Sequence, residues 1–115
     1  MPWVLLVDDH DDGREVLSEF LSVSGFEVEG CSSGEDALER IEARGVPGVV
    51  LTDLTLGAMS GVDLAKKLAS DAKTKAVPVV AVTGHVNYEN SDGLFAEVLP
   101  NPVPLPRLVE TVRRA

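Results

Sequence analysis

The sequence predicts an α/β fold in which helices cover both faces of a doubly wound, five-stranded parallel sheet. Five short apolar runs recur along the 115 residues, and patterns of helical period lie between most of them. Strands that alternate with helices are joined by right-handed crossovers, which makes the strands parallel. A chain of this length buries a single core, so we expect one domain over residues 1–115.

The composition of the apolar runs predicts the order of the strands. We expect strands at residues 3–7, 26–31, 48–52, 77–83 and 94–99. The first, third and fourth runs are continuously apolar, as strands buried on both faces are, whereas "FEVEGC" alternates and turns Glu27 and Glu29 outward. The second run and the weaker fifth run are therefore predicted to be edges, which gives the flavodoxin-like order 2-1-3-4-5.

Apolar stripes and capping residues define the helices. The stripes lie within residues 16–21, 37–41, 62–68 and 105–112. Asp12 with Glu15, and Ser33 with Asp36, have the three-residue spacing of an N-terminal cap, and Gly25 is placed to end the first helix.

The segment "GHVNYENSDG", which begins at Gly84, forms the fourth crossover. It is polar and rich in turn-forming residues. Two interpretations stay open here, a short helix and an irregular loop.

The charge, the cysteine content and the N-terminus limit the binding partners and the cellular compartment that we expect for this chain. The chain has 19 acidic and 10 basic residues, a formal net charge of -9, which argues against nucleic-acid binding and favours cations or basic partners. The single cysteine, Cys31, permits no internal disulfide and fits a reducing cytosol. The N-terminus has neither the basic region of a signal peptide nor an apolar run long enough to span a bilayer, so we expect a cytoplasmic protein.

Carboxylates follow two of the predicted central strands. Asp8 and Asp9 end the first strand and Asp53 ends the third, so all three should meet where the winding of the sheet reverses. Two like charges about 4 Å apart repel by roughly 4 kcal/mol at an effective dielectric of about 20. A hard divalent cation would relieve this repulsion, and oxygen-only ligands with partial solvent access favour Mg²⁺.

The same crevice offers a nucleophile and a hydroxyl group. A carboxylate such as Asp53 beside Mg²⁺ can attack phosphorus and form an acyl phosphate. Thr83 ends the fourth strand, so its hydroxyl should point into the crevice, and Gly84 leaves space for a phosphoryl group.

Four stretches, "VLLVDDHDD", "VVLTDLTLGAMSG", "VPVVAVTG" and "NPVPLPRL", together resemble the receiver domain of two-component response regulators. The resemblance covers essentially the whole chain. It implies that Asp8 and Asp9 are the acidic Mg²⁺ pair, Asp53 the phosphoacceptor, Thr83 the hydroxyl that meets the phosphoryl group, and Thr55 a metal ligand through its backbone carbonyl. It also implies a histidine kinase or histidine phosphotransfer protein as phosphodonor, with output through protein–protein contacts.

The sequence departs from the receiver pattern at the signalling end. Asn101 stands where receivers have a lysine that pairs with the phosphorylated aspartate, and Val98 stands where a switch tyrosine or phenylalanine is common. Asn101 also follows Thr83 by eighteen positions, several fewer than is usual in the family. The expectation is an atypical receiver.

Two other functions are compatible with the fold. A binding module that works without phosphate would fit Asn101 and Val98. An aspartyl-phosphate phosphohydrolase would need an acid two positions after its nucleophile, where this chain has Thr55, so we discount it. We interpret His10 and His85 as solvated loop residues, with the alternative that His10, beside the acidic pair, tunes metal or phosphatase chemistry.

Overall fold

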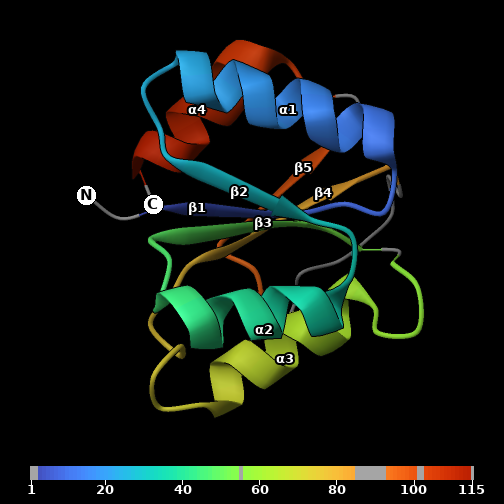
Figure 1. Cartoon of the computed structure of the whole chain (residues 1–115), viewed down its shortest axis with the longest axis vertical. Helices are drawn as coiled ribbons and strands as arrows, with labels where there is room; N and C mark the ends of the chain where they lie inside the picture. Colours follow the sequence, from blue (N-terminus) through green and yellow to red (C-terminus); the bar gives the residue numbers. More distant parts are fainter. Residues whose placement is uncertain (1–2, 55, 85–92, 101–102, 115) are drawn as a thin grey trace.

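The computed structural model describes residues 3–54, 56–84, 93–100 and 103–114. Its five strands form one parallel sheet in the order β2-β1-β3-β4-β5 (Figure 1). They are β1 (Val4–Val7), β2 (Val28–Cys31), β3 (Val49–Asp53), β4 (Val79–Thr83) and β5 (Glu97–Pro100). The predicted α/β class, the strand order and both edge strands are confirmed.

The described helices cover both faces of the sheet. α1 (Asp11–Val23) and α4 (Leu105–Arg114) lie on one face, and α2 (Gly34–Arg44) and α3 (Gly61–Ser70) lie on the other (Figure 1). Residues 85–92 of the fourth crossover lie outside the described residues, so both interpretations of that segment stay predictions.

The core consists of two apolar layers, one on each side of the sheet. Alternate residues of β1 serve the two layers: Leu5 contacts the layer under α2 and α3, and Leu6 contacts the layer under α1 and α4. Each of these leucines is at most 2% exposed. A strand covered on both faces must be apolar at every position, which explains the unbroken apolar run at the start of the chain.

The helix starts show one correct and one wrong prediction. The Ser33 hydroxyl accepts a hydrogen bond from the Asp36 amide at 3.1 Å, as the spacing predicted. The predicted Asp12 cap is wrong, because α1 already begins at Asp11 and His10 occupies the cap position without a side-chain hydrogen bond. The Asp8 carboxylate accepts from the His10 amide at 2.9 Å and turns the chain early, so Asp12 lies in the first helical turn.

α3 has a complete capping box that the sequence analysis missed. The Ser60 hydroxyl accepts from the Asp63 amide at 3.1 Å, and the Asp63 carboxylate accepts from the Ser60 amide at 3.3 Å. This box fixes the start of the helix that follows β3.

Gly25 follows the end of α1 with φ of 99°, in the left-handed region that glycine adopts at little cost.

The basic residues of α2 face the edge of the sheet formed by β2. Arg40 donates to Glu29 at 2.5 Å, and Arg44 donates to the other oxygen of the same carboxylate at 2.9 Å. Arg44 also pairs with Glu27, and its guanidinium carbon lies 4.6 Å from the centre of the buried Trp3 ring. Both arginines therefore pair with glutamates of the β2 edge, on one side of α2.

Candidate functional site

The register of the sheet brings the ends of three strands together. Val7 pairs with Thr52 across β1 and β3, and Asp53 pairs with Val82 across β3 and β4. The next residue after Val7 is Asp8, and the next after Val82 is Thr83. The sheet therefore positions Asp8, Asp53 and Thr83 along one carboxyl edge.

The acidic side chains converge at this edge. Asp8, Asp9, His10 and Asp53 each offer a ligand atom, and these four atoms all lie within 4.8 Å of one another. The Asp8 side chain is 17% exposed and that of Asp9 is 40% exposed, so the cluster is partly open to solvent. A small cavity of about 20 Å³ is lined by Asp8 and Asp53 beneath it. The structure thus brings together the three carboxylates singled out in the sequence.

The Arg14 side chain holds the acidic loop in place. The Arg14 guanidinium donates to the Asp8 carbonyl oxygen at 2.7 Å and to the Asp11 carboxylate at 2.6 Å. Arg14 therefore ties the first turn of α1 to the end of β1. Its positive charge also offsets part of the acidic run.

Close packing of α3 against the end of β3 fixes the Asp53 backbone. The Gly61 amide donates to the Leu54 carbonyl at 2.9 Å. A Cβ atom at position 61 would overlap the Asp53 carbonyl oxygen and lie only 2.9 Å from the Leu54 Cα. The glycine is required here because two backbone segments approach without room for a side chain.

His10 contributes more than a solvated loop residue would. Its side chain is 78% exposed, yet Nδ1 lies 3.1 Å from an Asp9 carboxylate oxygen and 3.6 Å from an Asp8 oxygen. The interpretation as a solvated residue agrees with this exposure, and the contact with Asp9 agrees with the alternative that His10 acts beside the acidic pair. The only sequence signal was its position directly after Asp9.

Of the remaining predicted residues, Thr83 and Val98 lie within the described part of the chain. Thr83 is 3% exposed at the end of β4. Val98 is half-buried and packs against the core layer under α2 and α3. Thr55 and Asn101 lie outside the described residues, so their predicted roles are untested.

The donor set suits a hard cation. Mg²⁺ binds oxygen ligands at about 2.0–2.1 Å in octahedral geometry, so opposite ligands are about 4.2 Å apart. The observed limit of 4.8 Å is only slightly larger, so a small closure of the carboxylates would suffice. The carboxylates of Asp8, Asp9 and Asp53 fit Mg²⁺ better than the His10 imidazole does, because imidazole favours transition metals.

Comparison with known proteins identifies the family. The sequence model of the response regulator receiver domain matches residues 4–97. The chain belongs to the response regulator receiver family. Receivers are generally signalling domains that bind Mg²⁺ at an acidic pocket, and the observed aspartate cluster matches that description. The match ends before Val98 and Asn101, the two departures noted in the sequence.

Relatives of this receiver domain include short and long proteins. DctD of Rhizobium meliloti, a C4-dicarboxylate transport transcriptional regulatory protein, is 31% identical over 99% of this chain, but the match spans only 25% of DctD. The polar-differentiation response regulator DivK of Brucella ovis is 26% identical, with 96% of this chain and 92% of DivK covered. The chain therefore spans about a quarter of one relative and nearly all of the other.

Solved structures show the same fold. The chemotaxis response regulator CheY4 of Vibrio cholerae superposes with a TM-score of 0.88 at 25% identity, covering 99% of this chain and 98% of CheY4. A CheY-like receiver domain from Methylobacillus flagellatus gives 0.87 at 30% identity, with 99% and 98% covered. Within the described ranges, no helix is both long enough and apolar enough to cross a membrane.

Proposed function

We propose that this receiver domain accepts a phosphoryl group on Asp53 from a phosphohistidine of a histidine kinase or histidine phosphotransfer protein. The observation that carries the proposal is the convergence of ligand atoms from Asp8, Asp9 and Asp53 within 4.8 Å at the carboxyl edge of the sheet. Asp53 ends the otherwise buried strand β3 and is itself partly exposed, which leaves it accessible to a phosphodonor. The family membership supports the signalling role.

The transfer is a single displacement at phosphorus. One carboxylate oxygen of Asp53 forms a bond to phosphorus while the phosphorus–nitrogen bond of phosphohistidine breaks, and that electron pair returns to the imidazole nitrogen. With a proton on the other ring nitrogen of the phosphohistidine, the imidazole leaves neutral, so the products are an aspartyl phosphate and a neutral histidine. Thr83, one position past the β4 partner of Asp53, is the hydroxyl proposed to meet the phosphoryl oxygens.

Mg²⁺ is the proposed cofactor. The carboxylates of Asp8, Asp9 and Asp53 would hold it, with the backbone carbonyl of Thr55 as a further ligand implied by the family resemblance. When bound, the ion neutralises charge on the transferring oxygens. His10 is close enough to hydrogen-bond Asp9 and so helps to orient that carboxylate.

A second candidate function is a phosphorylation-independent receiver that acts as a protein-binding module. The observation that favours it is Val98, which packs into the core where receivers often have a rotating aromatic ring. Asn101, proposed to occupy the position of the receiver lysine, brings no positive charge to an aspartyl phosphate. In either case the output would pass through contacts with partner proteins. We propose that the domain comprises residues 1–115 and works in the cytoplasm.

The intact mass of the protein after incubation with Mg²⁺ and acetyl phosphate distinguishes the two functions. We expect a labile phosphoryl adduct in the wild type that is absent from Asp53→Asn. Asp12→Asn is the matched control, because it removes one carboxylate charge from the exposed first turn of α1 outside the cluster. It should be labelled like the wild type.

Phosphoryl transfer would be refuted if the wild type binds Mg²⁺ but forms no adduct with acetyl phosphate or with a phosphorylated histidine donor. That result would favour the binding module. Equal labelling of wild type and Asp53→Asn would show that the phosphoryl group sits elsewhere.

A further inference from the structure

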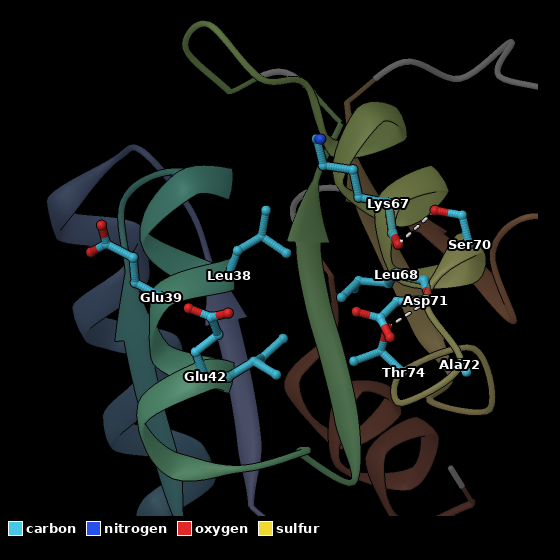
Figure 2. A pocket seen from close by; sticks show the side chains of 10 residues that line it. Leu38, Glu39, Glu42, Lys67, Leu68, Ser70, Asp71, Ala72 and Thr74 are labelled. Atoms are coloured by element: carbon cyan, nitrogen blue, oxygen red, sulfur yellow. Dashed lines mark hydrogen bonds between the residues drawn. The ribbon is translucent and has the colours of Figure 1, made fainter.

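A groove lies between α2 and α3, on the face of the sheet opposite α1 and α4. Its volume is about 660 Å³, within the range of ligand-binding clefts. Leu38, Ile41 and Leu68 supply apolar surface, and Thr74 closes it from the turn after α3. Figure 2 shows Leu38 of α2 extending toward α3, Glu39 extending from the opposite side of α2, and Asp71 and Thr74 beyond the end of α3.

The groove is separate from the acidic site. Helices of a parallel α/β sheet run opposite to the strands, so the ends of α2 and α3 lie at the amino edge of the sheet. The lining residues come from the second half of α2 and from positions 67–74, whereas Asp53 ends β3 at the carboxyl edge. A partner bound in the groove would leave the Asp53 cluster accessible.

The rim of the groove is predominantly acidic. Glu42 and Asp71 contribute carboxylates at the groove, Glu39 adds a third on the outer side of α2 (Figure 2), and Lys67 is the one basic residue among the lining residues. In Figure 2 the Lys67 side chain extends away from Glu42 and Asp71. Within the described part of the chain, Glu39, Glu42 and Lys67 form no side-chain ion pair or hydrogen bond.

The charges of α2 are segregated between its two sides. Arg40 and Arg44 pair with the glutamates of the β2 edge, so neither is available to the groove. Glu35, Glu39 and Glu42 follow one another at helical spacing on an exposed stripe. Like charges three or four residues apart on a helix repel, and a cationic partner would relieve that repulsion.

We propose that this groove binds an amphipathic helical segment of a protein partner, with apolar residues on the groove floor, Lys or Arg residues opposite Glu42 and Asp71, and a further Lys or Arg on the flank toward Glu39. An apolar floor with a charged rim is the pattern of helix-in-groove recognition. The charge of the rim selects a basic segment over an acidic one. The groove is thus an interaction surface that does not depend on phosphorylation of Asp53.

The test uses a fluorescein-labelled helical peptide of Leu, Ala and Lys, with Leu on one face and Lys on its flanks, and a second peptide with Glu in place of each Lys. Fluorescence anisotropy measures binding to the full chain, and amide NMR shifts locate it. The test variant is Glu39→Lys/Glu42→Lys. The matched control is Glu15→Lys/Glu19→Lys on α1, because both pairs are exposed and each changes the net charge from -9 to -5, four units.

We expect the lysine peptide to bind the wild type with shifts at residues 38–42 and 67–74, and the groove variant to bind at least about tenfold more weakly. The α1 control should stay within about twofold of wild type, since its charges lie on the other face. Leu38→Ala should weaken binding while Leu17→Ala, a half-buried leucine of α1, should not. Acetyl phosphate labelling of the groove variant should match the wild type, which separates this result from the proposed phosphoryl transfer.

Equal weakening in both charge variants would overturn the proposal, because it would indicate attraction by net charge alone. Binding weaker than about 1 mM in the wild type would also overturn it. So would a wild-type dimer that dissociates in the groove variant, because the occupant would then be a second copy of the chain.

Discussion

Replacing Gly61 by alanine should destabilise the domain and disturb the acidic site together. The new Cβ would overlap the Asp53 carbonyl oxygen and approach the Leu54 Cα to 2.9 Å. These are backbone atoms, which cannot rotate aside as a flexible side chain can. Overpacking of this kind costs about 1–3 kcal/mol, against which alanine recovers at most about 1 kcal/mol of helix propensity. Because the clash is with backbone atoms, we take the upper part of that cost, about 2–3 kcal/mol, which leaves a net loss of about 1–2 kcal/mol.

Urea unfolding measures this loss, with two glycine variants as references. Gly57→Ala meets no heavy atom within 4 Å, so it should leave stability unchanged or raise it by up to about 1 kcal/mol. The three heavy atoms nearest to a Cβ at position 34 all belong to the flexible Met59 side chain, so Gly34→Ala should lie between the other two. The Gly61 variant should also bind Mg²⁺ more weakly, because the Asp53 backbone must shift. Equal stability of the Gly61 and Gly57 variants would refute the reasoning.

Three further predictions concern the pocket and the core. Millimolar Mg²⁺ should raise the melting temperature of the wild type and not that of Asp9→Ala, and no Mg²⁺ effect in the wild type would refute the metal site. Asn101→Lys should bind the phosphoryl mimic beryllofluoride more tightly, because a charge-assisted hydrogen bond is about twice as strong as a neutral one; unchanged affinity would show that the lysine is not limiting. Burial, with a smaller contribution from Asp36, raises the pKa of the Cys31 thiol from 9.0 to about 11. The un-ionised thiol therefore makes its full contribution to the free energy of unfolding below pH 9, and this contribution should be lost as the pH rises toward 11. Cys31→Ala lacks the buried sulfur, so it should be less stable than wild type by about 1 kcal/mol at neutral pH. At about pH 10.5 ionisation of the thiol should lower the unfolding free energy of the wild type by about 2 kcal/mol, so urea unfolding should show that the difference between the two proteins has disappeared or changed sign.

Strand order was predictable because burial leaves a direct mark on composition. β1 carries an unbroken apolar run because Leu5 and Leu6 serve opposite core layers, and β2 alternates because Glu29 faces the arginines of α2. Once the order is known, the carboxylates that follow β1 and β3 must lie at the same edge. That is why the convergence of Asp8, Asp9 and Asp53 could be predicted from the sequence.

Features that depend on local competition or on distant partners were not predictable. Asp12 and Asp11 both suit a helix start, and the hydrogen bond from the His10 amide to Asp8 decided between them. The contact between Trp3 and Arg44 joins residues far apart in the chain, and no spacing rule indicates it. The groove between α2 and α3 escaped notice for the same reason, because its two walls come from separate helices.

The site of phosphorylation is the most direct test of the central proposal. Borohydride reduces an aspartyl phosphate to homoserine, so peptide mass mapping after acetyl phosphate treatment and reduction identifies the modified residue. We predict homoserine at position 53 alone, formed only when Mg²⁺ is present. Homoserine at position 8 or 9, or at no position in a protein that demonstrably binds Mg²⁺, would contradict the assignment of Asp53 as the phosphoacceptor.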